Sequence, residues 1–164
     1  MVEFTSSQAA SLVIRTLNNM FIFGNRINIE ESRKMYVEDI RKPYTLQNGE
    51  KSFENFINDR NNRFNTPSQA AKNRLVPPTK ILHFFNVPDM SDDAMMDIFS
   101  DSNAPFPTKV KWFESKSAKG AASGILEFET VEEAMEALVI ANNIEIEPEG
   151  GGRNFVLKLC FTRS

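Results

Sequence analysis

At 164 residues, the chain has the length of one or two small domains, and its 41% hydrophobic and 25% charged residues are an ordinary globular composition. No apolar run approaches the ~18 residues of a membrane-spanning helix, and the N-terminus has no signal-peptide pattern, so we expect an intracellular protein. The net charge of −3 is unevenly spread, because residues 33–79 carry nine basic and five acidic side chains whereas residues 80–164 carry eight and fourteen.

Residues 1–32 begin with a sequence that recurs near the end of the chain. Residues 1–22 align without a gap on residues 125–146, with six identical positions, including the pair Glu3 and Phe4. Such a repeat indicates two copies of one structural unit. The first copy is predicted to hold the tail of a strand, a helix from about Ser6 to Leu17 and a strand from about Arg26 to Ile29. The roughly 45 residues that lead into the second copy have no counterpart before the first, so we expect the chain to begin inside a domain.

Residues 33–79 are the predicted connection between the two copies. Their aromatic residues are scattered among polar ones, which is not the composition of a Gly/Ser tether: Tyr36, Tyr44, Phe53, Phe56 and Phe64. These rings belong either to a disordered segment or to a linker that packs on the motifs and fixes their orientation. Thr66-Pro67-Ser68-Gln69 has a capping residue followed by proline at the first helical position, and predicts a short helix near residues 67–73.

Residues 80–113 are predicted to form a strand, a helix and a second strand. Residues 81–85 are apolar and aromatic and read as a buried strand. Ser91 can cap the next helix, whose apolar stripe begins at Met95. Residues 109–113 alternate between lysine and apolar side chains, which is typical of a half-buried strand with Val110 and Trp112 inward.

Residues 114–164 are predicted to form a loop, a third strand, a second helix and a fourth strand. Residues 124–128 read as a strand, and Thr130 with Glu133 three residues later forms a capping box that opens a helix. A small hairpin, a triple-glycine turn and an alternating strand over residues 155–161 follow. The complete domain is therefore predicted over residues 80–164 as α+β with the order βαββαβ, a ferredoxin-like sheet against two helices.

Alternation along these strands sorts the side chains onto two faces. If Leu82 and Phe84 point toward the helices, then His83 and Phe85 stand on the opposite face with basic side chains, while the acidic residues gather on the helices. Flat rings for stacking and lysines for phosphate are what single-stranded nucleic acid requires. The candidate residues are His83, Phe85, Lys109, Lys111, Phe113, Lys116, Lys119, Ser123, Ile125, Lys158, Cys160 and Arg163.

These strings resemble the RNA recognition motif. Residues 82–87, LHFFNV, stand where the family has its first-strand hexamer, and residues 121–128, AASGILEF, where it has its third-strand octamer. The linker strings RNNRF and TPSQAAKNR and the ending LKLCF are similar to the polypyrimidine tract-binding protein family of heterogeneous nuclear ribonucleoproteins. Ser123 and Ile125 replace the octamer's two usual aromatics, His83 replaces a ring of the hexamer, and Glu127 adds an acid to the RNA-facing side.

The resemblance implies an incomplete motif over residues 1–32, a linker over 33–79 and a complete motif over 80–164. It further implies binding of single-stranded RNA, with CA-rich elements preferred, in pre-mRNA splicing and mRNA processing. The expected partners are pre-mRNA and other splicing regulators, with no membrane and no small-molecule substrate. The expected location is the nucleus, with shuttling to the cytoplasm left open.

An enzyme and a protein-interaction module are the two other classes of function that this fold allows. An enzyme on this fold, such as an acylphosphatase, needs an arginine in an anion-binding loop after the first strand, and residues 86–91 offer no cation. One cysteine and one histidine leave little material for a metal site or a nucleophile pair, so we expect no catalytic residues, no metal and no cofactor. A protein-interaction module that uses the fold without RNA remains the alternative.

Overall fold

The computed structural model describes residues 1–59, 62–63, 66, 68–69, 76–114, 121–148 and 150–162. The chain divides into two compact units, the first made of Met1–Asn18 and Ile29–Leu75 and the second of Asn19–Asn28 and Val76–Ser164. None of the helices within the described ranges has the length and apolar character needed to cross a membrane.

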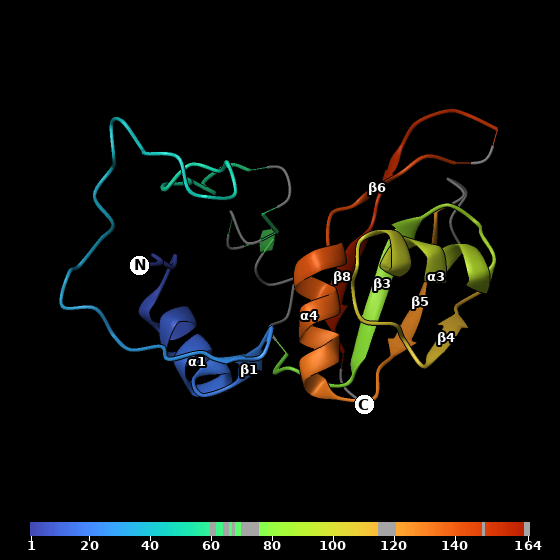
Figure 1. The fold of residues 1–164 in the computed structure, drawn as a ribbon, viewed down its shortest axis with the longest axis horizontal. Helices are drawn as coiled ribbons and strands as arrows, with labels where there is room; N and C mark the ends of the chain where they lie inside the picture. The colour runs from blue at the N-terminus through green and yellow to red at the C-terminus, as the bar shows by residue number, and fades with distance from the viewer. Residues whose placement is uncertain are drawn as a thin grey trace. The chain divides into compact units, whose positions relative to one another are not determined.

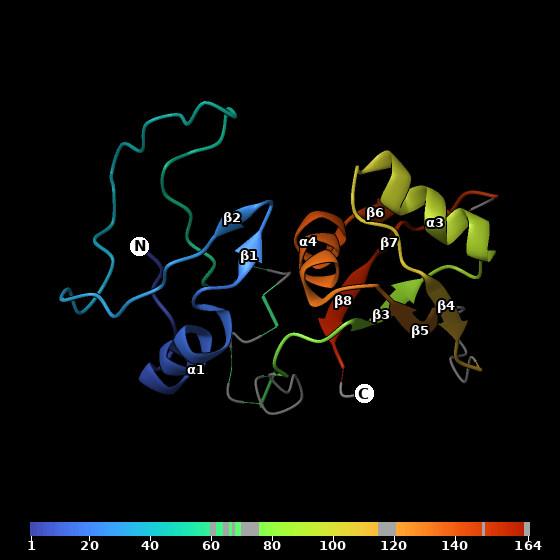
Figure 2. The ribbon, with the colours of Figure 1, turned by 60° about the horizontal axis from the view of Figure 1, so that its bottom comes forward.

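A four-stranded antiparallel sheet is the centre of the second unit. Its strands are β3 (Ile81–Val87), β4 (Lys109–Trp112), β5 (Ala122–Glu127) and β8 (Lys158–Phe161), arranged in the order β4-β5-β3-β8. The two helices, α3 (Asp92–Asp101) and α4 (Val131–Ala141), lie on the same side of this sheet, as Figure 2 shows. The predicted βαββαβ order is therefore confirmed, with β3 in the centre between β5 and β8 (Figure 1).

Both helices begin at the predicted capping residues. The Ser91 hydroxyl accepts a hydrogen bond from the backbone N–H of Ala94 at 3.1 Å. Thr130 and Glu133 form the expected capping box, in which Thr130 Oγ1 accepts from the Glu133 N–H at 3.1 Å. A small hairpin of β6 (Glu145–Ile146) and β7 (Phe155–Val156) follows α4. Local polar side chains thus define where both helices start.

The core lies between the sheet and the two helices. Its largest side chains are fully buried and come from every layer: Phe84, Phe99, Phe128, Leu82, Met95, Leu126, Leu157, Leu159 and Val87. Val110, Trp112 and Phe161 pack partly buried against them. The inward positions predicted from alternation are therefore the ones that form the core.

The second unit also contains a hairpin from the first repeat. Its strands are β1 (Phe21–Ile22) and β2 (Asn25–Arg26), with the Arg26 guanidinium 5.2 Å from the centre of the Phe21 ring. At its tip, the Phe23 N–H donates to the Glu136 Oε1 atom of α4 at 2.7 Å. This hairpin was not predicted from the sequence. The repeat aligns its residue 22 with residue 146 in β6, which forms the hairpin of the second copy.

The first repeat keeps its helix, but it lacks counterparts of the sheet strands β5 and β8. Helix α1 (Ser7–Leu17) begins at Ser6, whose side chain accepts from the Ala9 N–H at 3.2 Å. Of the strand predicted from about Arg26 to Ile29, only Arg26 is in a strand, β2. Residues 27–29, and residues 2–4 where the tail of a strand was predicted, are not part of any sheet. In the complete motif the corresponding strands β5 and β8 both pair with β3, and the first repeat has no strand in that central position. Without the shared neighbour, the two segments have no ladder to join.

In both repeats, the asparagine that follows the helix nevertheless makes a similar hydrogen bond to a later segment. The first of two asparagines accepts, through its side-chain oxygen, a backbone N–H from the segment that follows. The second asparagine has a left-handed backbone, with φ of 67° at Asn19 and 78° at Asn143. The two side-chain bonds are Ile29 N to Asn18 Oδ1 at 2.9 Å and Leu159 N to Asn142 Oδ1 at 3.0 Å. The sequence repeat is therefore also a structural one.

In the first unit, the linker residues form local turns. Thr45 and Lys51 form an isolated β-bridge, and inside it the Leu46 N–H donates to the Glu50 carbonyl at 2.7 Å. Farther along, Thr66 Oγ1 accepts from the Gln69 N–H at 3.2 Å, and Ser68 and Gln69 are helical. The start of the predicted short helix is thus present, and most of its expected length lies outside the described residues.

Candidate nucleic-acid interface

The sheet face opposite α3 and α4, called the open face below, carries the candidate side chains. On β3 from Ile81 to Phe85, and along β5, buried residues alternate with less buried ones, so that Leu82, Phe84 and Leu126 point inward. Antiparallel register then aligns the outward residues in rows across the strands. One row is Lys111, Ile125, His83 and Cys160; the next is Phe113, Ser123, Phe85 and Lys158; the last contains Lys109, Glu127 and Ile81.

Three rings converge where the first two rows meet, and we call them the ring cluster: His83, Phe85 and Phe113. The His83 ring centre lies 5.4 Å from that of Phe85 and 5.8 Å from that of Phe113. Phe113 is the most accessible of the three, with 44% of its surface exposed, whereas His83 and Phe85 are half-buried. Alternation in the sequence predicted that each ring lies on this face. The rings of β3 lie close to Phe113, at the end of β4, because of the strand order β4-β5-β3.

The outward residues of β5 beside this cluster are not aromatic. Ser123 and Ile125 stand where the third-strand octamer of the motif usually has its two aromatics. In the β3–β5 register, Ser123 lies beside Phe85 and Ile125 beside His83. Gly124, between them, faces inward beneath the Phe84 ring, and a Cβ there would lie 2.6 Å from Phe84 Cζ. The rings on the open face therefore come from the first strand and from the end of the second strand of the motif, and the third strand contributes none.

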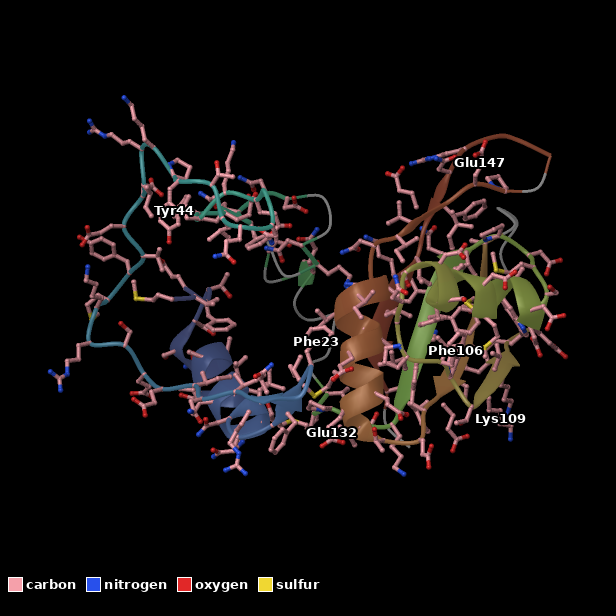
Figure 3. All side chains as sticks on the ribbon, in the orientation of Figure 1. Phe23, Tyr44, Phe106, Lys109, Glu132 and Glu147 are labelled. Carbon is pink, nitrogen blue, oxygen red and sulfur yellow. The ribbon has the colours of Figure 1, made fainter. Side chains whose placement is uncertain are left out.

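The lysines of the open face differ in their surroundings. Lys109 and Lys111 are exposed on β4, and Figure 3 shows Lys109 at the edge of the sheet. Lys158 is half-buried, and its Nζ donates to the Asn143 side-chain oxygen at 2.5 Å. Lys111 is thus better placed than Lys158 to meet a phosphate. Asn143 was not a candidate, although the repeated Asn-Asn pair marked it in the sequence.

Of the four remaining candidates, Cys160 lies among the described residues. Cys160 is a half-buried free thiol in the same row as His83. Lys116, Lys119 and Arg163 lie outside the described residues. Within the described ranges, no group of three or more His, Cys, Asp or Glu side chains is arranged to hold a metal ion.

Comparison with known proteins identifies two motifs in the chain. The family described as RRM domain matches residues 72–164. A second family description, RNA recognition motif (also known as RRM, RBD or RNP domain), matches residues 1–59.

Curated relatives cover nearly the whole chain. Heterogeneous nuclear ribonucleoprotein L of Mus musculus is 37% identical over 163 residues, which are 99% of this chain and 28% of that protein. Polypyrimidine tract-binding protein homolog 3 of Arabidopsis thaliana is 31% identical over 142 residues, 85% of this chain and 29% of that protein. The chain therefore spans less than a third of the length of these relatives.

Among solved structures, the one titled "Structure of Rna15 RRM with bound RNA (GU)" aligns with 53% of this chain and 86% of its own, with 17% identity and a TM-score of 0.39.

Proposed function

The chain belongs to the RNA recognition motif family, and from this premise we propose that its second unit binds single-stranded RNA on the open face. The observation that carries the proposal is the ring cluster, in which His83 lies within 6 Å of both Phe85 and Phe113. Base stacking on such rings is worth ~1–3 kcal/mol per base and tolerates any base, because every base has a flat face.

Charge on the two sides of the sheet supports the same orientation. Lys109 and Lys111 are exposed on the open face, where they can contact the backbone of a strand that stacks on the rings. The acids Asp92 and Asp93 open α3, and Glu132 lies on α4 at the other side of the sheet. The exposed lysines of β4 thus lie on the same face as the ring cluster, and the carboxylates of the two helices lie on the other side of the sheet.

The finer specificity follows from the resemblance to heterogeneous nuclear ribonucleoprotein L. We propose CA-rich single-stranded elements of pre-mRNA as the ligand, splicing and mRNA processing as the process, and the nucleus as the place. Other splicing regulators would be protein partners. The expected site consists of the twelve residues of the sequence analysis, with no catalytic step and no cofactor.

Fluorescence anisotropy with a labelled CA-repeat RNA tests the proposal. The wild-type chain should bind this RNA, and the double variant His83→Ala, Phe113→Ala should bind at least about fivefold more weakly, the equivalent of ~1 kcal/mol. Phe106→Ala is the matched control, because Phe106 is 53% exposed in the segment between α3 and β4 and is not part of the ring cluster. A wild-type chain that binds no RNA would leave the protein-interaction module as the better description.

A further inference from the structure

One acid stands on the face that we propose for RNA. Glu127 is exposed at the end of β5, in the outward set that begins with Ser123 and Ile125. Lys109 and Ile81 are its register partners on the two neighbouring strands. Glu127 is two positions along β5 from Ile125, the partner of His83, which places its Cα about 7 Å along the strand from that row. The carboxylate therefore stands in the row next to that of His83, and one row farther from Phe85 and Phe113.

A carboxylate in this position must either repel the RNA or receive a hydrogen bond from it. Phosphate carries the same sign of charge, so contact with the backbone is unfavourable. An ionised carboxylate is acceptor-only, and the donors that bases offer at their edges include the exocyclic amino groups of cytosine and adenine. Uracil has a carbonyl oxygen where cytosine has this amino group, and its one edge donor, N3–H, lies between two carbonyl oxygens that a carboxylate repels. The chemistry of the acid thus distinguishes amino-bearing bases from uracil.

The other repeat shows the equivalent carboxylate accepting such a donor. Glu3 aligns with Glu127 in the gap-free repeat, and its Oε2 atom accepts the backbone N–H of Val37 at 2.8 Å in the first unit. The aligned carboxylate of the first copy, which is not part of any sheet, thus accepts a neutral N–H donor. In the described part of the chain, Glu127 has neither an ion pair nor a side-chain hydrogen bond of this kind.

We propose that Glu127 accepts a hydrogen bond from the exocyclic amino group of a cytosine or adenine and so selects these bases against uracil. This inference rests on the proposed RNA binding and assigns part of its base preference to one side chain. Lys109, opposite Glu127 on β4, offsets the negative charge, so a strand can pass with its phosphates near the lysine and a base edge at the carboxylate.

Glu127→Gln tests the inference, because the amide can donate to the uracil oxygen and carries no charge. Affinities are measured for two RNAs of equal length, a CA repeat and an all-uridine strand. The ratio of the two affinities should fall by about fivefold or more, equivalent to ~1 kcal/mol. Glu132→Gln removes the same charge from the exposed surface of α4 and should leave the ratio unchanged (Figure 3).

The possible results separate the inference from the proposed function. If Glu127→Gln strengthens binding of both RNAs by the same factor, Glu127 acts only as a repelling charge and the inference is overturned. An unchanged ratio with unchanged affinities also overturns it, while RNA binding itself stands. A wild-type chain that binds neither RNA refutes the proposed function and the inference together. Equal urea midpoints, followed by Trp112 fluorescence, establish that each variant is folded.

Discussion

Replacing Gly124 with alanine should destabilise the second unit, because the position under the ring cluster has no room for a Cβ. A Cβ built there would lie 2.6 and 2.7 Å from two atoms of the Phe84 ring and would overlap the Lys111 carbonyl oxygen. The Phe84 ring is fully buried and packs edge-on against Trp112, with 4.8 Å between the ring centres. Neither the ring nor the β4 backbone can move without disturbing the core or the β4–β5 ladder.

We expect Gly124→Ala to lower the free energy of unfolding by an amount near the upper end of the range for overpacked cores. Inserting a methyl group into a well-packed core costs typically ~1–3 kcal/mol. Since both a buried ring and a backbone oxygen oppose the Gly124 Cβ, we expect about 2–3 kcal/mol. For a domain of this size each kcal/mol lowers Tm by roughly 4–8 °C, so Tm should fall by about 10–20 °C.

Urea unfolding followed by tryptophan fluorescence measures this change directly. Trp112 is the single tryptophan of the chain and lies in β4, so its signal reports the second unit. Ser123→Ala is the matched control, because its side chain points to the open face and should change stability by less than about 0.5 kcal/mol. If Gly124→Ala were as stable as this control, the placement of β4, β5 and Phe84 would be wrong, and with it the geometry of the ring cluster.

Three further changes test separate parts of the account. His83→Ala should weaken binding of a CA-repeat RNA by about 5- to 150-fold at an unchanged urea midpoint, since its ring faces outward; unchanged affinity in an anisotropy titration would remove His83 from the site. Lys111→Gln should weaken binding of many RNA sequences alike and reduce the salt slope by about 0.7, whereas a changed base preference at constant slope would mean that Lys111 reads bases. Thr130→Ala removes the N-cap of α4 and should cost ~0.5–2 kcal/mol in the same urea experiment, and a loss below that range would mean that the capping box with Glu133 contributes little.

The complete motif could be predicted because its strand alternation and its helix caps in the sequence agree with the packing of the folded domain. Alternation along residues 81–85 and 124–128 identified the inward side chains, and the caps at Ser91 and Thr130 marked the helix starts. The strand ends differ by only a few residues, and the predicted last strand is interrupted at Leu157, which separates β7 from β8. That break occurs because residues 155–156 pair with β6, whereas residues 158–161 pair with β3.

The first repeat was predicted less well, for a physical reason. The repeat indicated the tail of a strand at the start of the chain and a strand from about Arg26 to Ile29. Of these residues only Arg26 joins a ladder, in β2, because a strand forms only when a neighbour pairs with it. Helix α1 needed no such partner to form its backbone hydrogen bonds, and it was predicted correctly. The hairpin of β1 and β2 was missed because its two-residue strands are too short for a periodicity signal.

Side-chain pairing within the site could not be derived from the sequence either. Alternation placed Lys158 outward, but its hydrogen bond to Asn143 depends on the turn after α4 meeting β8. The approach of Phe113 to His83 depends on the strand order β4-β5-β3, in which β5 has a serine and an isoleucine between the two rings. Strand order is a property of the whole sheet, so these contacts appear only in the folded domain.

The most direct test of RNA binding on the open face is the amide spectrum of the chain, recorded with and without a CA-repeat oligonucleotide. We expect the largest shifts at His83, Phe85, Lys111, Phe113 and Ile125, with little change at Val139, which is 56% exposed on α4. Shifts that gather on α3 and α4 while the strands stay unchanged, or a spectrum that the RNA does not alter, would contradict the account.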